Sequence, residues 1–237
     1  MVRELVQTRA AGFWTPTRRR DALVIVLTLV TGAVDAIGLL RLGGVFTSVM
    51  TGNMVLLGLA SATHDASIVL HTGDAFLAYV IGSFIGARVA GHAEAEEHLW
   101  PRPVVRALVA ELVVMVIFFV WWEAANASPG TGVAYALLGL NAAALGIQSA
   151  AVLRFGISGL STTYLTGTLT QFIAGLTKRH EPLQVRSALI LLALITGASF
   201  GGMAVLHAAR FAPLVPTGAL AFVVVGGWAS FHRRERA

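Results

Sequence analysis

Long apolar stretches separated by short polar segments recur along the whole chain. A stretch of about 20 apolar residues is long enough to cross the hydrocarbon core of a bilayer as an α-helix. The pattern therefore predicts an all-α polytopic membrane protein. The stretches lie near residues 22–41, 44–62, 70–90, 103–122, 131–153, 159–177, 185–208 and 213–231.

The second half of the chain repeats the first. Arg41-Leu42-Gly43 and the segment Thr47–Asn53 return as Arg154-Phe155-Gly156 and Thr162–Thr168. Such a duplication is common in transporters, where a site forms between the two halves. The predicted units are a single membrane domain at 1–237, repeat 1 at 21–123, repeat 2 at 131–231 and a cytoplasmic N-terminal arm at 1–20.

The second and sixth stretches differ from the others because each carries a polar, glycine-containing motif near its middle. Met50-Thr51-Gly52-Asn53 and Leu165-Thr166-Gly167-Thr168 leave apolar arms of only half a span on either side. We therefore expect six crossings plus two re-entrant or broken motif helices. The alternative is eight crossings, arranged as four in each half.

The distribution of Lys and Arg favours six crossings. With the N-terminus inside, six crossings put fifteen basic residues on the cytoplasmic side and two outside, whereas eight crossings give eleven and six. Cytoplasmic loops of membrane proteins carry the excess of positive charge. Three crossings per half is an odd number, so the two halves would run in opposite directions through the membrane, as inverted repeats do.

Composition agrees with a membrane protein and excludes other classes. Hydrophobic residues make up 56% of the chain, charged residues make up 12%, and the mean hydropathy is +0.76. The net charge of +5 comes from basic residues that flank apolar stretches, which is typical of contact with anionic lipid rather than nucleic acid. The chain has no Cys, so disulfides and thiolate metal sites are excluded.

The two motifs form the candidate binding site. A glycine can end a helix, and the backbone groups freed at membrane depth must face protein or a watery cavity. Such helix ends bind ions or polar solutes. The alternative is close helix packing, which is the favoured interpretation for Gly82, Gly86, Gly197 and Gly201. The candidate residues for binding the solute or ion are Asp35, Thr51, Gly52, Asn53, Gln148, Thr166, Gly167 and Thr168.

Two carboxyl groups lie inside apolar stretches. Asp35 and Glu111 would each cost free energy in hydrocarbon, so each should face a partner or water. The position matching Asp35 in the second repeat is Gln148, an amide in place of a charge. Arg41 and Arg154, where each first span meets its motif, are the candidate charge partners. They would act either as a structural ion pair or as a gate.

A likeness to a known family covers nearly the whole chain, and four segments carry it. They are Gly32-Ala33-Val34-Asp35-Ala36, Arg41-Leu42-Gly43, Phe46–Asn53 and Thr162–Thr168. The chain resembles the YoaK-like family of bacterial inner-membrane proteins, a domain of unknown function. The resemblance implies a multi-pass protein of the bacterial inner (plasma) membrane and supplies no substrate. The charge distribution places both termini in the cytoplasm.

We expect a small secondary transporter or channel-like permease for a small polar or ionic solute. Asp35 would be the coupling carboxylate and Glu111 a second proton site. Two alternatives stay open: a lipid-modifying intramembrane enzyme, and an assembly or sensor subunit that transports nothing. No nucleophile or acidic metal cluster is evident, so we expect no enzymatic activity, no cofactor and no metal. The expected partners are the bilayer and the solute, and a homo-oligomer stays open.

Overall fold

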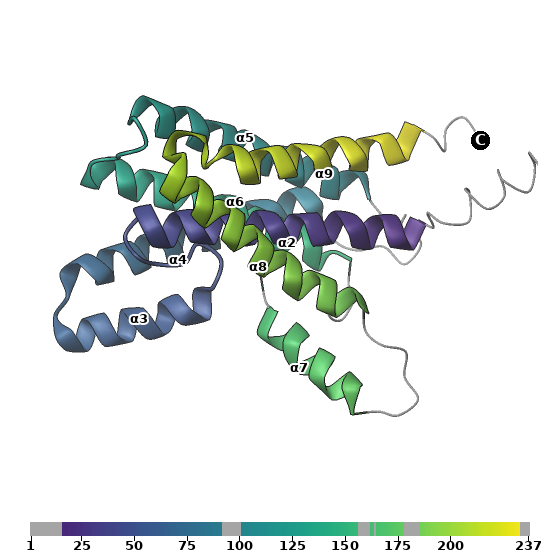
Figure 1. The fold of residues 1–237 in the computed structure, drawn as a ribbon, viewed down its shortest axis with the longest axis horizontal. Coiled ribbons are helices and arrows are strands. Elements are labelled where there is room, and N and C mark those ends of the chain that lie inside the picture. Colours follow the sequence, from purple (N-terminus) through teal and green to yellow (C-terminus); the bar gives the residue numbers. More distant parts are fainter. Residues whose placement is uncertain (1–15, 92–100, 156–161, 164, 178–184, 233–237) are drawn as a thin grey trace, which may run out of the picture.

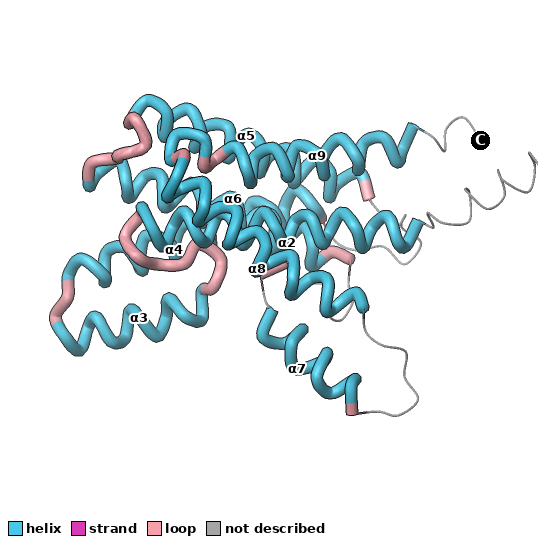
Figure 2. Tube along the Cα trace, viewed as in Figure 1, coloured by secondary structure: helices cyan, strands magenta, loops and turns pink. Residues whose placement is uncertain are grey.

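The computed structural model describes residues 16–91, 101–155, 162–163, 165–177 and 185–232. Within these residues every regular element is helical (Figures 1 and 2). The predicted all-α fold is therefore confirmed. The helices are α2 (Pro16–Arg41), α3 (Met50–Thr63), α4 (Ala66–Ala90), α5 (Arg102–Ala124), α6 (Thr131–Leu153), α7 (Leu165–Leu176), α8 (Val185–His207) and α9 (Leu214–His232), with a short 3-10 turn at Ala209–Phe211 before α9.

Six of the described helices are long and apolar enough to cross a membrane, whereas α3 and α7 are not. With 14 and 12 residues, α3 and α7 extend about 21 Å and 18 Å at roughly 1.5 Å per residue. The hydrocarbon core of a bilayer is about 30 Å thick. The candidate spans are Thr17–Arg41, Ala66–Ala90, Arg102–Ala124, Thr131–Leu153, Val185–His207 and Ala209–Ala229.

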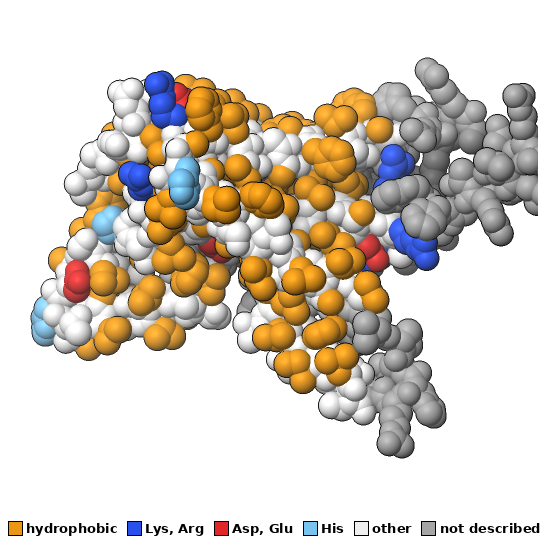
Figure 3. Space-filling view, in the orientation of Figure 1, with side chains coloured by type: hydrophobic (Ala, Val, Ile, Leu, Met, Phe, Trp, Pro, Cys, Tyr) orange, Lys and Arg blue, Asp and Glu red, His pale blue; other side chains and the backbone are white. Residues whose placement is uncertain are grey.

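The long helices lie side by side in one bundle, and α3 and α7 lie on its lower side in the view of Figure 1. α3 packs against α4, and α7 packs against α8. Two clusters of buried apolar side chains fill the bundle, one of them between α2, α5, α6 and α9. The exposed large apolar residues of α4, α5 and α8 are mainly Leu, Ile, Val and Phe, as expected of surfaces that contact lipid. Figure 3 shows the apolar surface over α7 and α8, on the face nearest the viewer.

The contacts between helices show a two-fold pattern. Each contact has a counterpart when α2, α3, α4 and α5 are exchanged with α6, α7, α8 and α9, in that order. α2 packs on α8 as α6 packs on α4, and α2 packs on α9 as α6 packs on α5. The contacts of α3 with α4 and of α7 with α8 also correspond. In Figure 1, α2 and α6 run in opposite directions along the bundle.

Glycines bring the backbones of α4 and α6 into direct contact. A Cβ on Gly82 would overlap the carbonyl oxygen of Ala143, and one on Gly146 would overlap that of Tyr79. Small residues at such positions let membrane helices approach closely, where van der Waals packing stabilises the pair. The packing interpretation of the glycines in α4 is therefore confirmed.

The crossing of α2 with α8 uses corresponding positions. A Cβ on Gly197 would overlap the carbonyl oxygen of Leu29, and one on Gly32 would overlap that of Leu194. Gly197 follows Gly82 by 115 residues, and Gly146 follows Gly32 by 114. The two helices of each crossing also run in the same direction. Gly82 and Gly86 meet Ala143 and Ile147, so the residue numbers rise together along both helices, and the pair α2/α8 shows the same order.

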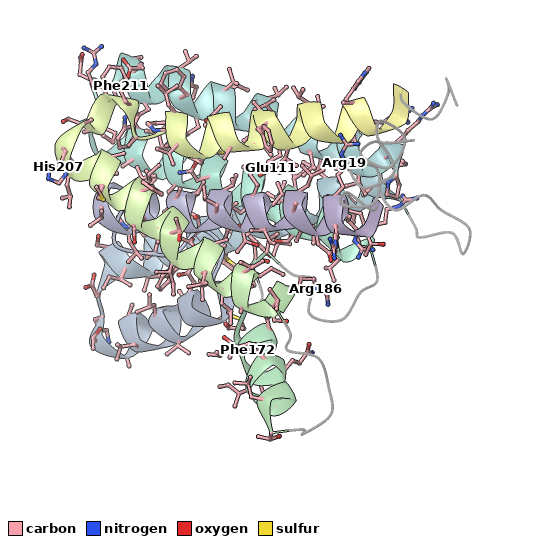
Figure 4. All side chains as sticks on the ribbon, turned by 45° about the vertical axis from the view of Figure 1, so that its right-hand side comes forward. Arg19, Glu111, Phe172, Arg186, His207 and Phe211 are labelled. Carbon is pink, nitrogen blue, oxygen red and sulfur yellow. The ribbon has the colours of Figure 1, made fainter. Side chains whose placement is uncertain are left out.

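Basic residues of the described chain concentrate at one end of the bundle, where α2, α5 and α8 begin. Figure 4 shows Arg19 and Arg186 there, with His207 and Phe211 at the opposite end. We call the first of these the arginine-rich end. Residues 1–15 of the predicted arm and the basic residues at 178–179 and 233–236 lie outside the described residues. The arginines at the arginine-rich end are Arg18, Arg19, Arg20, Arg88, Arg102, Arg106, Arg154 and Arg186, whereas Arg41 and Arg210 lie at the opposite end.

Replacing Gly82 with alanine should destabilise the protein because its methyl group cannot fit against α6. We expect Gly82→Ala to lower the free energy of unfolding by about 1–3 kcal/mol, the usual cost of overpacking. Gly73→Ala is the matched control, since a Cβ at Gly73 in the same helix meets open space. It should be neutral or slightly stabilising. Thermal unfolding in detergent measures both, and equal melting temperatures would contradict the close crossing.

Candidate functional site

Asp35 fastens the segment that joins α2 to α3. Its Oδ1 accepts hydrogen bonds from the backbone N–H groups of Thr47 (2.8 Å) and Ser48 (2.9 Å) and from the Thr47 hydroxyl (2.8 Å). Its Oδ2 accepts one from the Ser48 hydroxyl. All three residues are buried. A buried carboxylate with four hydrogen bonds recovers part of its desolvation cost, and two backbone donors gain a partner that lipid could not supply.

Asn53 closes the same segment from the side of α3. Its side-chain oxygen accepts a hydrogen bond from the N–H of Phe46 (3.1 Å), and its amide nitrogen donates to the carbonyl of Phe46 (2.6 Å). Asn53 is 1% exposed. Asp35 and Asn53, both candidates from the sequence, therefore meet around one loop, where each satisfies backbone groups that would otherwise lack partners.

The helix break precedes the motif instead of falling within it. α2 ends at Arg41, and Gly43 and Gly44 turn the chain with φ of 99° and 73°. α3 begins at Met50, so the segment Thr51–Asn53 belongs to its first helical turn. The expectation that Gly52 itself ends a helix is therefore wrong. The residues with positive φ that follow the end of α2 are Gly43 and Gly44, whereas Gly52 lies within α3.

The second motif is likewise the first turn of a short helix, since α7 begins at Leu165. Gly167 is therefore helical as well. Thr166 is exposed and its carbonyl accepts a hydrogen bond from Thr170, whereas Thr168 is buried. Thr51 in the first motif is also exposed. The hydroxyls of Thr51 and Thr166 therefore point away from the bundle core.

Hydroxyl groups take the place of the carboxylate in the second half. The Ser149 hydroxyl in α6 lies 2.8 Å from that of Thr163, just before α7, and donates to the carbonyl of Leu145 (2.8 Å). The Tyr79 hydroxyl in α4 donates to Ser149 (2.8 Å). The sequence alone did not single out Ser149, Thr163 or Tyr79 for such a role.

Ser149, not Gln148, occupies the position that matches Asp35. Gly32 and Gly146 sit at the same place in their respective crossings, and Asp35 and Ser149 each follow by three residues. Their hydrogen-bond partners in the following loops also correspond. The expectation that Gln148 matches Asp35 is therefore wrong by one residue. The spacing between the two glycines was the signal in the sequence that could have identified the match.

Gln148 ties α6 to α2. Its amide nitrogen donates to the carbonyl of Leu27 (3.2 Å) and to the hydroxyl of Thr31 (2.9 Å). Its side-chain oxygen has no hydrogen-bond partner among the described residues. Gln148 thus contributes one bonded and one unsatisfied polar atom to the apolar core.

Neither intramembrane carboxyl group is paired with an arginine of the described residues. Arg41 is exposed, and its guanidinium donates to the carbonyl of Val205 at 3.4 Å. Arg154 forms the C-cap of α6. The oxygens of Asp35 are bonded to hydroxyl and backbone groups, and those of Glu111 have no partner in the described chain. The expectation that Arg41 and Arg154 are their charge partners is wrong, because both guanidinium groups lie at span ends.

Glu111 is the ionisable group of the core that no described residue satisfies. It is 0% exposed in α5, and neither carboxyl oxygen has a hydrogen-bond partner there. Figure 4 shows it inside the bundle, between α2 and α9. Asn141 on α6 is also 0% exposed with both side-chain atoms unpartnered. Since α5 packs against α6, these groups lie on adjoining helices. Buried polar groups without partners are costly, and in membrane proteins they mark functional positions.

The six apolar spans define a multi-pass α-helical membrane protein. A family profile described as "Protein of unknown function (DUF1275)" matches residues 23–226. The chain is also 36% identical over 165 residues to the UPF0700 transmembrane protein YoaK of Bacillus subtilis (strain 168), which covers 70% of this chain and 71% of that protein. No solved structure matches. The chain belongs to the DUF1275 family, so the YoaK-like resemblance is confirmed.

Removing the Asp35 carboxylate should release the segment between α2 and α3. Asp35→Ala leaves buried backbone and hydroxyl donors unsatisfied, so we expect a loss of roughly 2 kcal/mol or more in the free energy of unfolding. Asp35→Asn keeps one acceptor oxygen and should lose less. Thr51→Ala, at an exposed position of the same region, should melt like the parent protein. If Asp35→Ala also melts like the parent in detergent, the fastening role is wrong.

Proposed function

We propose that this protein is a small secondary transporter or channel-like permease for a small polar or ionic solute. The observation that carries the proposal is the buried carboxyl group of Glu111, which has no partner among the described residues. An ionisable side chain inside a membrane bundle is typical of a pathway for protons, ions or polar solutes. Asn141 and Gln148 add unpartnered polar atoms on the neighbouring helix, where a solute would find hydrogen-bond partners.

In this proposal Glu111 takes the coupling role, and Asp35 positions α3. Asp35 already accepts four hydrogen bonds from Thr47 and Ser48, so most of the acceptor capacity of its carboxylate is used within the protein. Asn53 has the same positioning function.

We also propose that the chain crosses the membrane six times, with α3 and α7 re-entrant and the two halves inverted. Three observations support this arrangement: the short lengths of α3 and α7, the opposite directions of α2 and α6, and the matched glycine crossings. The arginine-rich end would then face the cytoplasm, with both termini, and the protein would lie in the bacterial inner membrane.

Three exposed positions distinguish six crossings from eight. Six crossings put Ala66 and Ala208 on the outer side and Thr177 on the inner side, whereas eight put Ala66 and Thr177 inside together. The chain has no native Cys, so Ala66→Cys, Thr177→Cys and Ala208→Cys can be labelled singly. We expect a membrane-impermeant maleimide to label Ala66→Cys and Ala208→Cys in intact cells but not Thr177→Cys. Labelling of Ala208→Cys alone would support eight crossings.

Neutralising Glu111 should strongly reduce proton flux while leaving the fold intact. We would reconstitute the protein in vesicles that contain the pH dye pyranine and impose an inside-negative potassium diffusion potential. Protons should enter faster than in protein-free vesicles, and Glu111→Gln should reduce this rate by about tenfold or more, since it removes the titrating group.

The matched control for this experiment is Glu123→Gln, which changes a carboxylate in an ion pair with the exposed Arg210. It should conduct protons like the parent protein. Equal proton entry in Glu111→Gln would remove Glu111 from the mechanism. If the parent vesicles neither acidify nor swell in glycerol faster than empty ones, the permease proposal itself fails.

A further inference from the structure

At the end of the bundle opposite the arginine-rich end, three pieces of chain surround an open hollow of about 280 Å³. They are the end of α2, the turn between α5 and α6, and the turn between α8 and α9. Arg41 lines the hollow from the first, residues 126–128 from the second and residues 208–211 from the third. Basic side chains are visible at this end, on the left of Figure 3.

Two guanidinium groups face this hollow. Arg41 is exposed and makes one long hydrogen bond, 3.4 Å to the carbonyl of Val205. Arg210 is 61% exposed and donates twice to one oxygen of Glu123, at 3.2 Å and 2.9 Å. Two cations therefore meet one carboxylate, and the hollow has a positive excess. Guanidinium groups present several donors in a fixed fork, which suits the oxygens of a phosphate.

The position of this charge runs against the distribution in the rest of the described chain. Eight arginines lie at the arginine-rich end, whereas Arg41 and Arg210 lie at the opposite end and converge on one hollow. Membrane proteins keep positive charge off one side of the bilayer. Arg41 and Arg210 depart from this bias and line the same hollow. Their position therefore indicates a role in binding an anion rather than a role in setting the orientation of the protein in the membrane.

Phe211 lines the hollow, and Leu40 and Leu206 lie within two residues of its lining residues Arg41 and Ala208 in the sequence. Leu40, Leu206 and Phe211 are 49%, 69% and 61% exposed, and Figure 4 shows Phe211 at this end. A cationic hollow at a bundle end, beside exposed apolar side chains, fits a phospholipid whose headgroup phosphate binds the arginines while its chains follow the helices. A free phosphate would use the same donors without the apolar contacts.

We propose that this hollow binds a phosphate-bearing anion, with Arg41 and Arg210 as its ligands. The source is either the headgroup of an anionic phospholipid or free inorganic phosphate. The site is independent of the transport proposal, because it involves neither Glu111 nor the α5–α6 core.

The absence of native Cys makes a direct binding assay practical. Ser128 lines the hollow and is exposed, so Ser128→Cys can carry the environment-sensitive dye bimane. The labelled full-length protein in neutral detergent is titrated separately with dioleoyl phosphatidylglycerol and with inorganic phosphate. We expect a saturable fluorescence change with at least one. A response to phosphatidylglycerol alone assigns a lipid site, whereas a response to phosphate assigns a site for the free anion.

Charge variants in the same labelled background test the two ligands. Arg41→Gln and Arg210→Gln should each raise the Kd by about tenfold, the usual effect of one charge-assisted hydrogen bond. Glu123→Gln should lower the Kd, because it frees Arg210 from its ion pair. Arg18→Gln, at the arginine-rich end, should leave it unchanged. Absence of a saturable response, or an unchanged Kd in the Arg41→Gln/Arg210→Gln double variant of normal melting temperature, would overturn the proposal.

Discussion

The fold depends on satisfying a short piece of non-helical backbone inside the bundle. Between Arg41 and Met50 the chain leaves one helix and starts another, and lipid offers no partners for the freed groups. The Asp35 carboxylate supplies two of those partners, and the Asn53 amide supplies two more. These hydrogen bonds fix the place where α3 begins relative to α2, and so they position the hairpin of α3 with α4.

The glycine crossings set the second constraint. They press backbone against backbone in the pairs α2/α8 and α4/α6, and only small residues fit at the points of closest approach. The buried side-chain groups without partners include Glu111 on α5 and Asn141 on α6, the helix that packs against α5. The close glycine crossings form a rigid framework, and beside it lie buried polar groups that lack hydrogen-bond partners. Such an arrangement supports the proposed pathway, since the framework can stay fixed while the polar groups bind a solute.

The spans could be predicted because length and hydropathy alone identify a helix that crosses a bilayer. The buried role of Asp35 and Asn53 was also within reach, since polar residues inside apolar stretches must find partners. The identity of those partners was not, because Thr47 is twelve residues from Asp35 and only the turn at Gly43 brings them together. The prediction that Arg41 and Arg154 pair with the buried carboxyl groups was wrong because it rested on closeness in sequence alone. Both arginines lie at the ends of spans, where a guanidinium group can reach water and needs no buried partner.

The two crossings also constrain how the chain is assembled during synthesis. α2 is the first described span to emerge from the ribosome, yet the helix that its backbone fits most closely is α8, the last span but one. Until α8 has been inserted, the small residues of α2 face either lipid or a temporary neighbour such as an insertase. The first half therefore cannot reach its final packing alone, and maturation must wait until nearly the whole polypeptide has entered the bilayer.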